Sequence, residues 1–157
     1  MLIPRSFSGV TTGRRRRCGW LDLVIVQYST TVNSYTAINL TKLDILDTFT
    51  EVKVAVAYRD PVTKEKIEPF PTDLDLLEKV EVEYITLKGW NESISACREY
   101  SQLPLSCREY CECIERFVGV KIKHIGVGKS TSTTSPNCRR ALLTSNIGPN
   151  REDMIIR

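Results

Sequence analysis

The chain has no long apolar run and little net charge, and each shortage excludes a class of protein. None of its apolar stretches, such as residues 23–26, approaches the roughly 20 residues of a membrane-spanning helix. Residues 1–10 also lack the apolar block of a secretory signal. The formal net charge is only +3, from 22 basic and 19 acidic side chains, too small for the broad positive field that binds nucleic acid. We therefore expect a cytoplasmic protein with neither a membrane nor a nucleic acid as its partner.

Cysteine and histidine occur in a pattern that does not complete a metal site. Cys107, Cys111 and Cys113 form a cluster, but no second pair of cysteines or histidines accompanies it. On a helix, Cys113 would point away from the other two. His124 is the only histidine, and we interpret it as a structural residue of a predicted strand. In a reducing compartment we expect the six cysteines to be free thiols, and no metal ligands in this chain.

Stretches typical of strands and of helices alternate along the sequence. Alternating or β-rich residues predict strands over 36–40, 51–58, 80–87 and 120–125. The capping-box spacing of Thr72 and Asp75 predicts the start of a short helix. Residues 104–118 have helical periodicity, with Pro104 suited to the first turn and Gly119 to the end. This alternation predicts an α/β fold, a layered sheet with flanking helices.

Three short stretches could carry chemistry, and the first is Thr41–Asp44, directly after a predicted strand. A carboxylate at a strand end can accept hydrogen bonds from the ring N–H and the amino group of guanine, and adenine offers no matching pair of donors. This spacing is also typical of the guanine-reading element of GTP-binding proteins. The alternative is an Asp that caps a helix beside a solvated Lys.

The second stretch is GVGKS, residues 126–130, after the predicted strand that contains His124. It is not a Walker phosphate loop, because that motif needs a glycine where Lys123 stands. A Gly-x-Gly turn at a strand end allows the backbone to approach a planar ligand closely. A simple tight turn explains the same residues.

The third stretch is the arginine run of residues 14–17, which follows Thr11, Thr12 and Gly13. Arginine is favoured where a planar fork of donors holds a carboxylate or phosphate, and Thr hydroxyls and Gly amides can add donors to the same anion. The run leads into residues 18–26, which are apolar and expected to be buried. A loop of a binding site and a solvated basic run both remain open.

These three stretches, in this order, resemble adenylosuccinate synthetase. GVTTGRRRRCGWLDLV is similar to the family's aspartate-binding loop and the helix after it, LTKLDILD to its guanine-recognition segment, and VKVAVAYR to the next strand. The similarity continues through VEVEYITLKGW and LPLSCREYCECIERFVGVKI to GVGKS. It covers most of the chain and corresponds to the C-terminal third of a family member. The resemblance implies the C-terminal part of a P-loop NTPase-like fold.

The resemblance also implies a GTP-dependent ligase that joins IMP and L-aspartate to give adenylosuccinate, with Mg²⁺ as cofactor and a homodimer as the complete enzyme. The residues that match the aspartate and IMP loop are Val10, Thr11, Thr12, Gly13, Arg14, Arg15 and Arg16. Those that match the GTP site are Arg16, Lys42, Leu43, Asp44, Gly126, Val127 and Gly128. Within the loop, Thr11, Thr12 and Arg14 match the residues at the carboxylates of aspartate.

Two departures from the family pattern define the expected domain organisation. The family's glycine-rich phosphate loop, catalytic Asp, catalytic His and magnesium ligands lie in an N-terminal region with no counterpart here, so we expect no catalytic residue in this segment. Residues 131–150, rich in Ser, Thr, Asn and Pro, separate the matched region from a family-like end. We expect one partial domain over 1–157, with an atypical start (1–9), the family region (10–130), an insert or disordered loop (131–150) and that end (151–157).

Two hypotheses about function remain open. The chain is either a fragment of adenylosuccinate synthetase or a non-catalytic, purine-nucleotide-binding or regulatory fragment. By itself it is expected to form no adenylosuccinate, because phosphoryl transfer needs the phosphate cradle and charge neutralisation that these residues do not supply.

Overall fold

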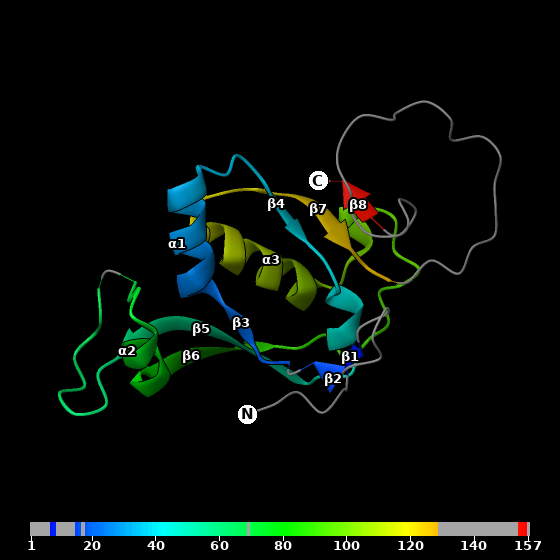
Figure 1. Ribbon diagram of the computed structural model, residues 1–157. Helices are drawn as coiled ribbons and strands as arrows, with labels where there is room; N and C mark the ends of the chain where they lie inside the picture. The colour runs from blue at the N-terminus through cyan, green and yellow to red at the C-terminus, as the bar shows by residue number, and fades with distance from the viewer. Residues whose placement is uncertain (1–6, 9–14, 17, 69, 129–153, 157) are drawn as a thin grey trace.

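The computed structural model describes residues 7–8, 15–16, 18–68, 70–128 and 154–156. In this part of the chain, two three-stranded sheets combine with two helices of more than two turns, α1 (Leu23–Asn33) and α3 (Leu105–Val118) (Figure 1). A two-stranded antiparallel ladder joins β1 (Phe7–Ser8) to β2 (Arg15–Arg16). The predicted α/β fold of sheets with flanking helices is confirmed.

The first sheet has the order β3-β5-β6 and contains the longest strands. Antiparallel β5 (Glu51–Arg59) and β6 (Glu81–Lys88) pair along nearly their whole lengths, and the short β3 (Leu21–Asp22) joins β5 in parallel. The alternating residues of 51–58 and 80–87 predicted both long strands. Val52 and Val54 of β5 are almost completely buried, which explains why this strand is rich in valine.

The second sheet has the order β4-β7-β8 and joins strands that lie far apart in the sequence. β4 (Ile38–Leu40) pairs in parallel with β7 (Ile122–Gly126), and β8 (Met154–Ile156) pairs with β7 in antiparallel fashion. The strands predicted over 36–40 and 120–125 are therefore present but start two residues later. The segment 131–150 lies outside the described residues.

The helices begin and end where side chains or backbone geometry satisfy their terminal groups. At the start of α1, Asp22 Oδ1 accepts hydrogen bonds from the Val24 and Ile25 amides at 3.0 and 3.3 Å. At the end of α3, Gly119 adopts a positive φ of 78°, as glycine does after many helices.

Two expectations for the helices are corrected. The short α2 (Leu74–Lys79) is capped by Asp73, not Thr72, because the Asp73 carboxylate accepts the Asp75 amide. Residues 18–26 are not uniformly buried either: Leu23 is fully buried, whereas Ile25 is 44% exposed. The helical period turns Ile25 away from the core face that Leu23 occupies.

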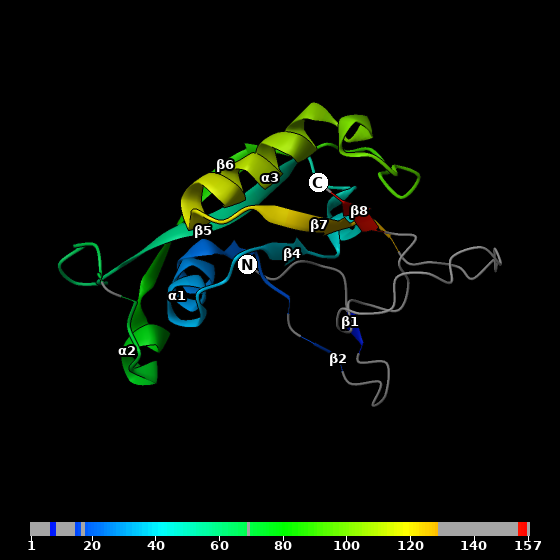
Figure 2. The same ribbon diagram turned by 90° about the horizontal axis from the view of Figure 1, so that it is seen from above.

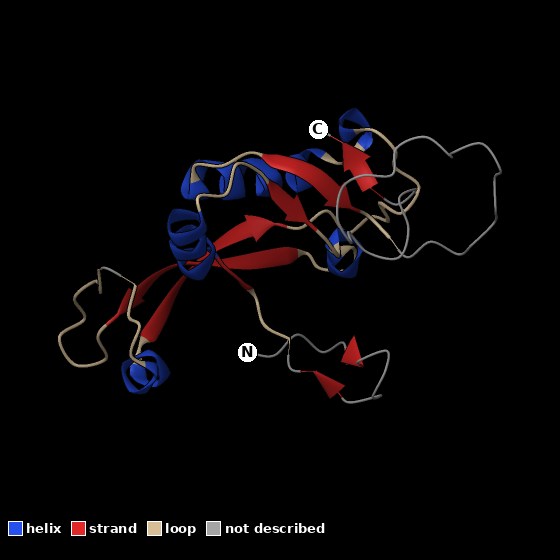
Figure 3. Cartoon of the chain, turned by 45° about the horizontal axis from the view of Figure 1, so that its top comes forward, coloured by secondary structure: helices blue, strands red, loops and turns tan. Residues whose placement is uncertain are grey.

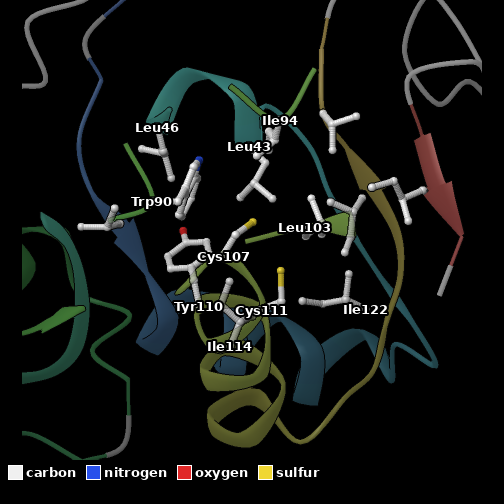
Figure 4. Close-up of a cluster of buried hydrophobic side chains, with 14 of the residues drawn as sticks. Leu43, Leu46, Trp90, Ile94, Leu103, Cys107, Tyr110, Cys111, Ile114 and Ile122 are labelled. Carbon is white, nitrogen blue, oxygen red and sulfur yellow. The ribbon is translucent and has the colours of Figure 1, made fainter. Parts of the chain in front are cut away.

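The two main helices lie next to one another, as the view from above shows (Figure 2). Gln27 Nε2 of α1 donates to the Phe117 carbonyl of α3 at 3.0 Å. Towards the other end of α3, a cluster of buried side chains lies between that helix and the 3₁₀ turn η1 (Leu43–Leu46) (Figure 4). Leu43 and Leu46 point from η1 into this cluster, which also holds Trp90 and Tyr110. None of the described helices is long and apolar enough to cross a membrane.

Candidate functional site

The candidate site lies where β4 and β7 end. The two strands are parallel, and Leu40 of β4 pairs with Ile125 of β7. Because the carboxyl ends of parallel strands meet at one edge of a sheet, ligands bind in the crevice outside that edge. Residues 41–44 leave the edge after β4, and Val127 and Gly128 leave it after β7. The structure thus brings together two stretches that the sequence separates by more than 80 positions.

The backbone after β4 turns through an uncommon conformation. Lys42 has φ of 65° and ψ of 31°, in the left-handed region, which costs a residue with a side chain about 1–3 kcal/mol. The next residue, Leu43, is 1% exposed and holds η1 in the core. The strained turn therefore fixes the backbone at the position that the sequence motif predicts for base recognition.

Asp44 presents a buried oxygen that the described residues leave unsatisfied. Its Oδ1 is buried and, within the part of the chain that the structure describes, has no hydrogen-bond partner. A buried acceptor without a donor costs about 1–3 kcal/mol, and more when it is charged. This oxygen is therefore suited to accept a hydrogen bond from a ligand or from a segment that lies beyond the described residues.

On the β7 side, one residue of the Gly-Val-Gly turn anchors the other two. Val127 is fully buried, and Gly126 before it is buried as well. Gly128 is partly exposed, and a Cβ built on it would lie 3.7 Å from the Cβ of Ser95, an ordinary contact. Gly128 therefore faces the segment that contains Ser95.

That segment, residues 90–95, lies against Gly128 through Ser95. We call it the third wall, beside residues 41–44 and 126–128, and the sequence analysis did not identify it. Trp90 Nε1 donates to Asp47 Oδ1 at 2.9 Å, and the Ile94 amide donates to Asp47 Oδ2 at 3.2 Å. Asp47 directly follows η1, so its carboxylate connects the turn that carries Asp44 to this wall. The only signal in the sequence was a second acid three residues after Asp44.

A close backbone approach sets the course of the third wall. Gly89 donates its amide to the Thr50 carbonyl at 2.8 Å, and a Cβ on Gly89 would lie 1.9 Å from the Phe49 carbonyl oxygen. Only glycine fits there. The chain therefore leaves β6 beside residues 49 and 50, which lead from η1 into β5. Figure 3 shows a short helical turn near the strand ends of both sheets.

The arginine run is described only in part. Residues Val10, Thr11, Thr12, Gly13 and Arg14 of the predicted loop lie outside the described residues. The backbones of Arg15 and Arg16 pair with Ser8 and Phe7 in β1. Downstream, a pocket of about 180 Å³ lies between Gly19–Leu21 and Leu40–Leu46. The chain that leads away from the arginines therefore lies beside the chain that carries Lys42 and Asp44.

Two of the three clustered cysteines lie in the core, and the third does not. Cys107 and Cys111 are fully buried, whereas Cys113 is partly exposed on another face of α3. A hydrogen bond with Cys111, together with burial, raises the pKa of the Cys107 thiol far above its ordinary value. Among the described residues, no group of three His, Cys, Asp or Glu side chains could hold a metal ion. His124 lies in β7, opposite Asn39 and Ile156.

Comparison with known proteins identifies the family. The family model described as adenylosuccinate synthetase matches residues 6–135, which is most of the chain. The chain belongs to the adenylosuccinate synthetase family. An adenylosuccinate synthetase from Neurospora crassa is 54% identical over 149 residues, covering 95% of this chain and 30% of the relative. One from Malassezia globosa is 57% identical over 120 residues, covering 76% of this chain and 26% of the relative.

A solved structure gives the same family and the same fold. A fully ligated adenylosuccinate synthetase from Plasmodium falciparum superposes with a TM-score of 0.79 at 35% identity, covering 96% of this chain and 31% of that chain. The present chain thus spans about three tenths of the length of the synthetases that it matches. The resemblance of this chain to the C-terminal third of the family is confirmed.

Proposed function

We propose that this chain forms the guanine-binding and aspartate-binding part of a GTP-dependent synthetase. The reaction joins IMP to L-aspartate and yields adenylosuccinate, GDP and phosphate. The observation that carries the proposal is the buried Oδ1 of Asp44, to which the described residues donate no hydrogen bond, at the edge where β4 and β7 end. Guanine offers two adjacent donors to such a carboxylate, the ring N–H and the amino group. In this proposal Lys42 and Leu43 line one side of the base, and Gly126, Val127 and Gly128 line the other.

The arginine loop supplies the anion-binding part of the same proposal. Val10, Thr11, Thr12, Gly13, Arg14, Arg15 and Arg16 bind aspartate and IMP, and Arg16 also contacts GTP. Family membership supports these roles, and so does the position of residues 19–21 beside residues 40–46. Clustered arginines suit a cleft into which aspartate, IMP and GTP each bring negative charge.

Three further properties are proposed through membership of the family: dependence on Mg²⁺, a homodimeric state and a cytoplasmic location. The described residues do not form a site that fits Mg²⁺, since no group of three potential ligands lies together among them. We therefore assign no step to the metal through this chain. Its own residues bind and orient: Asp44 the base, and the arginine loop the substrates' anionic groups.

The proposal is tested by Asp44→Asn in a full-length synthetase that carries this sequence as its C-terminal third. The substitution turns one acceptor into a donor, which mismatches guanine but matches xanthine, whose C2 carries a carbonyl. We expect the KM for GTP to rise roughly 10- to 100-fold and the use of xanthosine triphosphate to improve. Steady-state kinetics with both nucleotides measure the change.

The matched control is Asp73→Asn, the same substitution at the exposed cap of α2. Figures 1 and 2 show α2 at the opposite end of the molecule from β8. This control should leave the nucleotide preference as it is. An Asp44→Asn enzyme that still prefers GTP to the same degree would remove Asp44 from the base site.

Arg14→Leu tests the aspartate loop in the same full-length protein. The change deletes a forked donor for a carboxylate, a loss of about 2–4 kcal/mol in transition-state binding. The KM for aspartate should rise more than the KM for IMP, as initial-rate measurements with each substrate varied in turn will reveal. Small and equal effects on every substrate would favour a solvated basic run.

A further inference from the structure

We propose that Asp47 is a positioning residue for guanine recognition. Its carboxylate holds the wall of residues 90–95 against η1, so that Asp44 and Gly128 keep the separation that a purine base needs. This inference rests on the proposed function, because it concerns the same base site. It adds a residue that neither touches the base nor belongs to the sequence motif.

Asp47 meets two buried donors, one with each oxygen. Oδ1 accepts the Trp90 indole N–H at 2.9 Å, and Oδ2 accepts the Ile94 amide at 3.2 Å. Trp90 is 7% exposed and Ile94 1%, so water does not compete freely for either donor. Hydrogen bonds to an ionised acceptor are roughly twice as strong as those between neutral groups. The carboxylate is therefore a firm link between two segments more than 40 positions apart.

The link reaches the base site at both of its ends. On one side, the Asp47 amide donates to the Asp44 carbonyl at 3.3 Å, so both acids belong to one turn. On the other side, Ile94 precedes Ser95, the residue against which Gly128 lies. Movement of the wall away from η1 would therefore change the spacing between Asp44 and Gly128.

Other contacts also hold residues 90–95 in place, at their C-terminal end and in the core. Arg98 Nη1 donates to the Ser95 carbonyl at 2.8 Å, which fixes the C-terminal end of the wall. Trp90 packs beside Tyr110 of α3, with ring centroids 6.0 Å apart, and both lie in the cluster of Figure 4. The wall is thus held at its ends and in the core, and Asp47 is its hydrogen-bonded link to the turn of Asp44.

A carboxylate suits this position better than its amide. Both neighbours are donors, and a carboxylate has only acceptors to offer. In Asp47→Asn one oxygen becomes an NH₂ group that would face an N–H donor, and one of the two bonds is lost. Trp90→Phe removes the indole N–H that donates to Asp47 and keeps an aromatic ring in the core. Asp47→Asn therefore weakens the link by changing the acceptor, and Trp90→Phe weakens it by removing a donor.

The experiment measures KM values for GTP, ITP, IMP and aspartate, and the unfolding temperature, in the same full-length synthetase. ITP lacks the amino group that Asp44 would bind, so the ratio of kcat/KM for GTP and ITP reports how well Asp44 is placed. We expect Asp47→Asn to raise the KM for GTP roughly 3- to 10-fold and to lower the GTP/ITP ratio, with the KM for IMP unchanged. Trp90→Phe should act in the same direction, and the double variant should cost less than the sum of both.

The matched control is Glu115→Gln. Glu115 is also a buried carboxylate, 7% exposed, and its Oε1 accepts the Ile122 amide at 2.9 Å. It holds the start of β7, at the opposite end of the strand from Gly126. We expect this variant to lower the unfolding temperature about as much as Asp47→Asn while leaving the GTP/ITP ratio unchanged.

The outcomes separate the inference from the proposed function. If Asp47→Asn and Trp90→Phe lower the unfolding temperature but leave the GTP/ITP ratio and every KM unchanged, Asp47 is only structural and the inference is overturned. Should Asp47→Asn not fold, Trp90→Phe decides the question by the same ratio. If Asp44→Asn itself leaves nucleotide preference unchanged, the proposed function fails, whatever the Asp47 variants do.

Discussion

The sheet β3-β5-β6 joins residues 21–22, 51–59 and 81–88, whereas the sheet β4-β7-β8 joins residues 38–40, 122–126 and 154–156. The first depends on one long antiparallel pair, β5 with β6, whose strands are consecutive in this sheet and are joined by residues 60–80. The second depends on short strands that only the surrounding core brings together. Its parallel pair sends two loops from one edge, and the candidate site lies at that edge. A sheet assembled from distant strands can thus collect functional residues that a locally paired sheet keeps apart.

The largest expected effect comes from truncating a buried side chain in the middle strand of each sheet. Ile125 of β7 and Val54 of β5 are both fully buried. Ile125→Ala should lower the free energy of unfolding by about 2–5 kcal/mol and Val54→Ala by about 2 kcal/mol, as urea titration will measure. Only Ile125→Ala should also raise the KM for GTP, because Ile125 directly precedes the turn that contains Gly128. Equal increases in the KM for GTP in the two variants would show that both sheets support the site to the same extent.

A smaller effect concerns Tyr58, which ties the first sheet to the start of α1. Its hydroxyl donates to Asp22 Oδ2 at 2.6 Å. Burial, and then the hydrogen bond to Asp22, raise the pKa of Tyr58 well above its ordinary value of 10.0. Tyr58→Phe removes this bond, and we expect a loss of about 1–2 kcal/mol in the free energy of unfolding at pH 7.

The sign of the pH dependence follows from that raised pKa. Above pH 10 an unfolded tyrosine loses its proton while the folded Tyr58 keeps it, so the folded state binds more protons and stability falls as pH rises. Tyr58→Phe should make this fall less steep in urea titrations between pH 9 and 11. Tyr110, whose pKa burial also raises, stays in the variant and keeps part of the slope. An unchanged slope would show that the folded Tyr58 titrates normally.

The smallest effect is expected at the solvent-exposed edge of the first sheet. Arg59 Nη2 lies 2.7 Å from Glu83 Oε2, and both side chains are 42% exposed. Exposed ion pairs contribute about 1 kcal/mol or less and weaken with salt. Glu83→Gln should therefore change the urea midpoint only slightly, and less so in 1 M salt. A loss as large as that of Ile125→Ala would contradict the view that buried packing dominates both sheets.

The sequence predicted the parts of the fold that depend on neighbours along the chain. Alternating apolar residues located β5 and β6, and helical periodicity with Gly119 located α3, because these patterns reflect local geometry. One local detail was predicted wrongly: Asp73 caps α2 where Thr72 was expected, since both residues can accept an N-terminal amide. The motif at Lys42 and Asp44 and the Gly-Val-Gly turn were also recognised from residue type and spacing alone.

What the sequence by itself determined is therefore the family, the main strands and helices, and the two motifs at residues 41–44 and 126–128. The tertiary structure alone decided that these motifs share an edge, and that residues 90–95 form a wall beside them. The link from Asp47 to Trp90 and Ile94 depends on the pairing of β4 with β7 and on the close approach of Gly89 to Phe49. Such contacts follow from how separate elements pack around one core, and no periodicity along the chain encodes them.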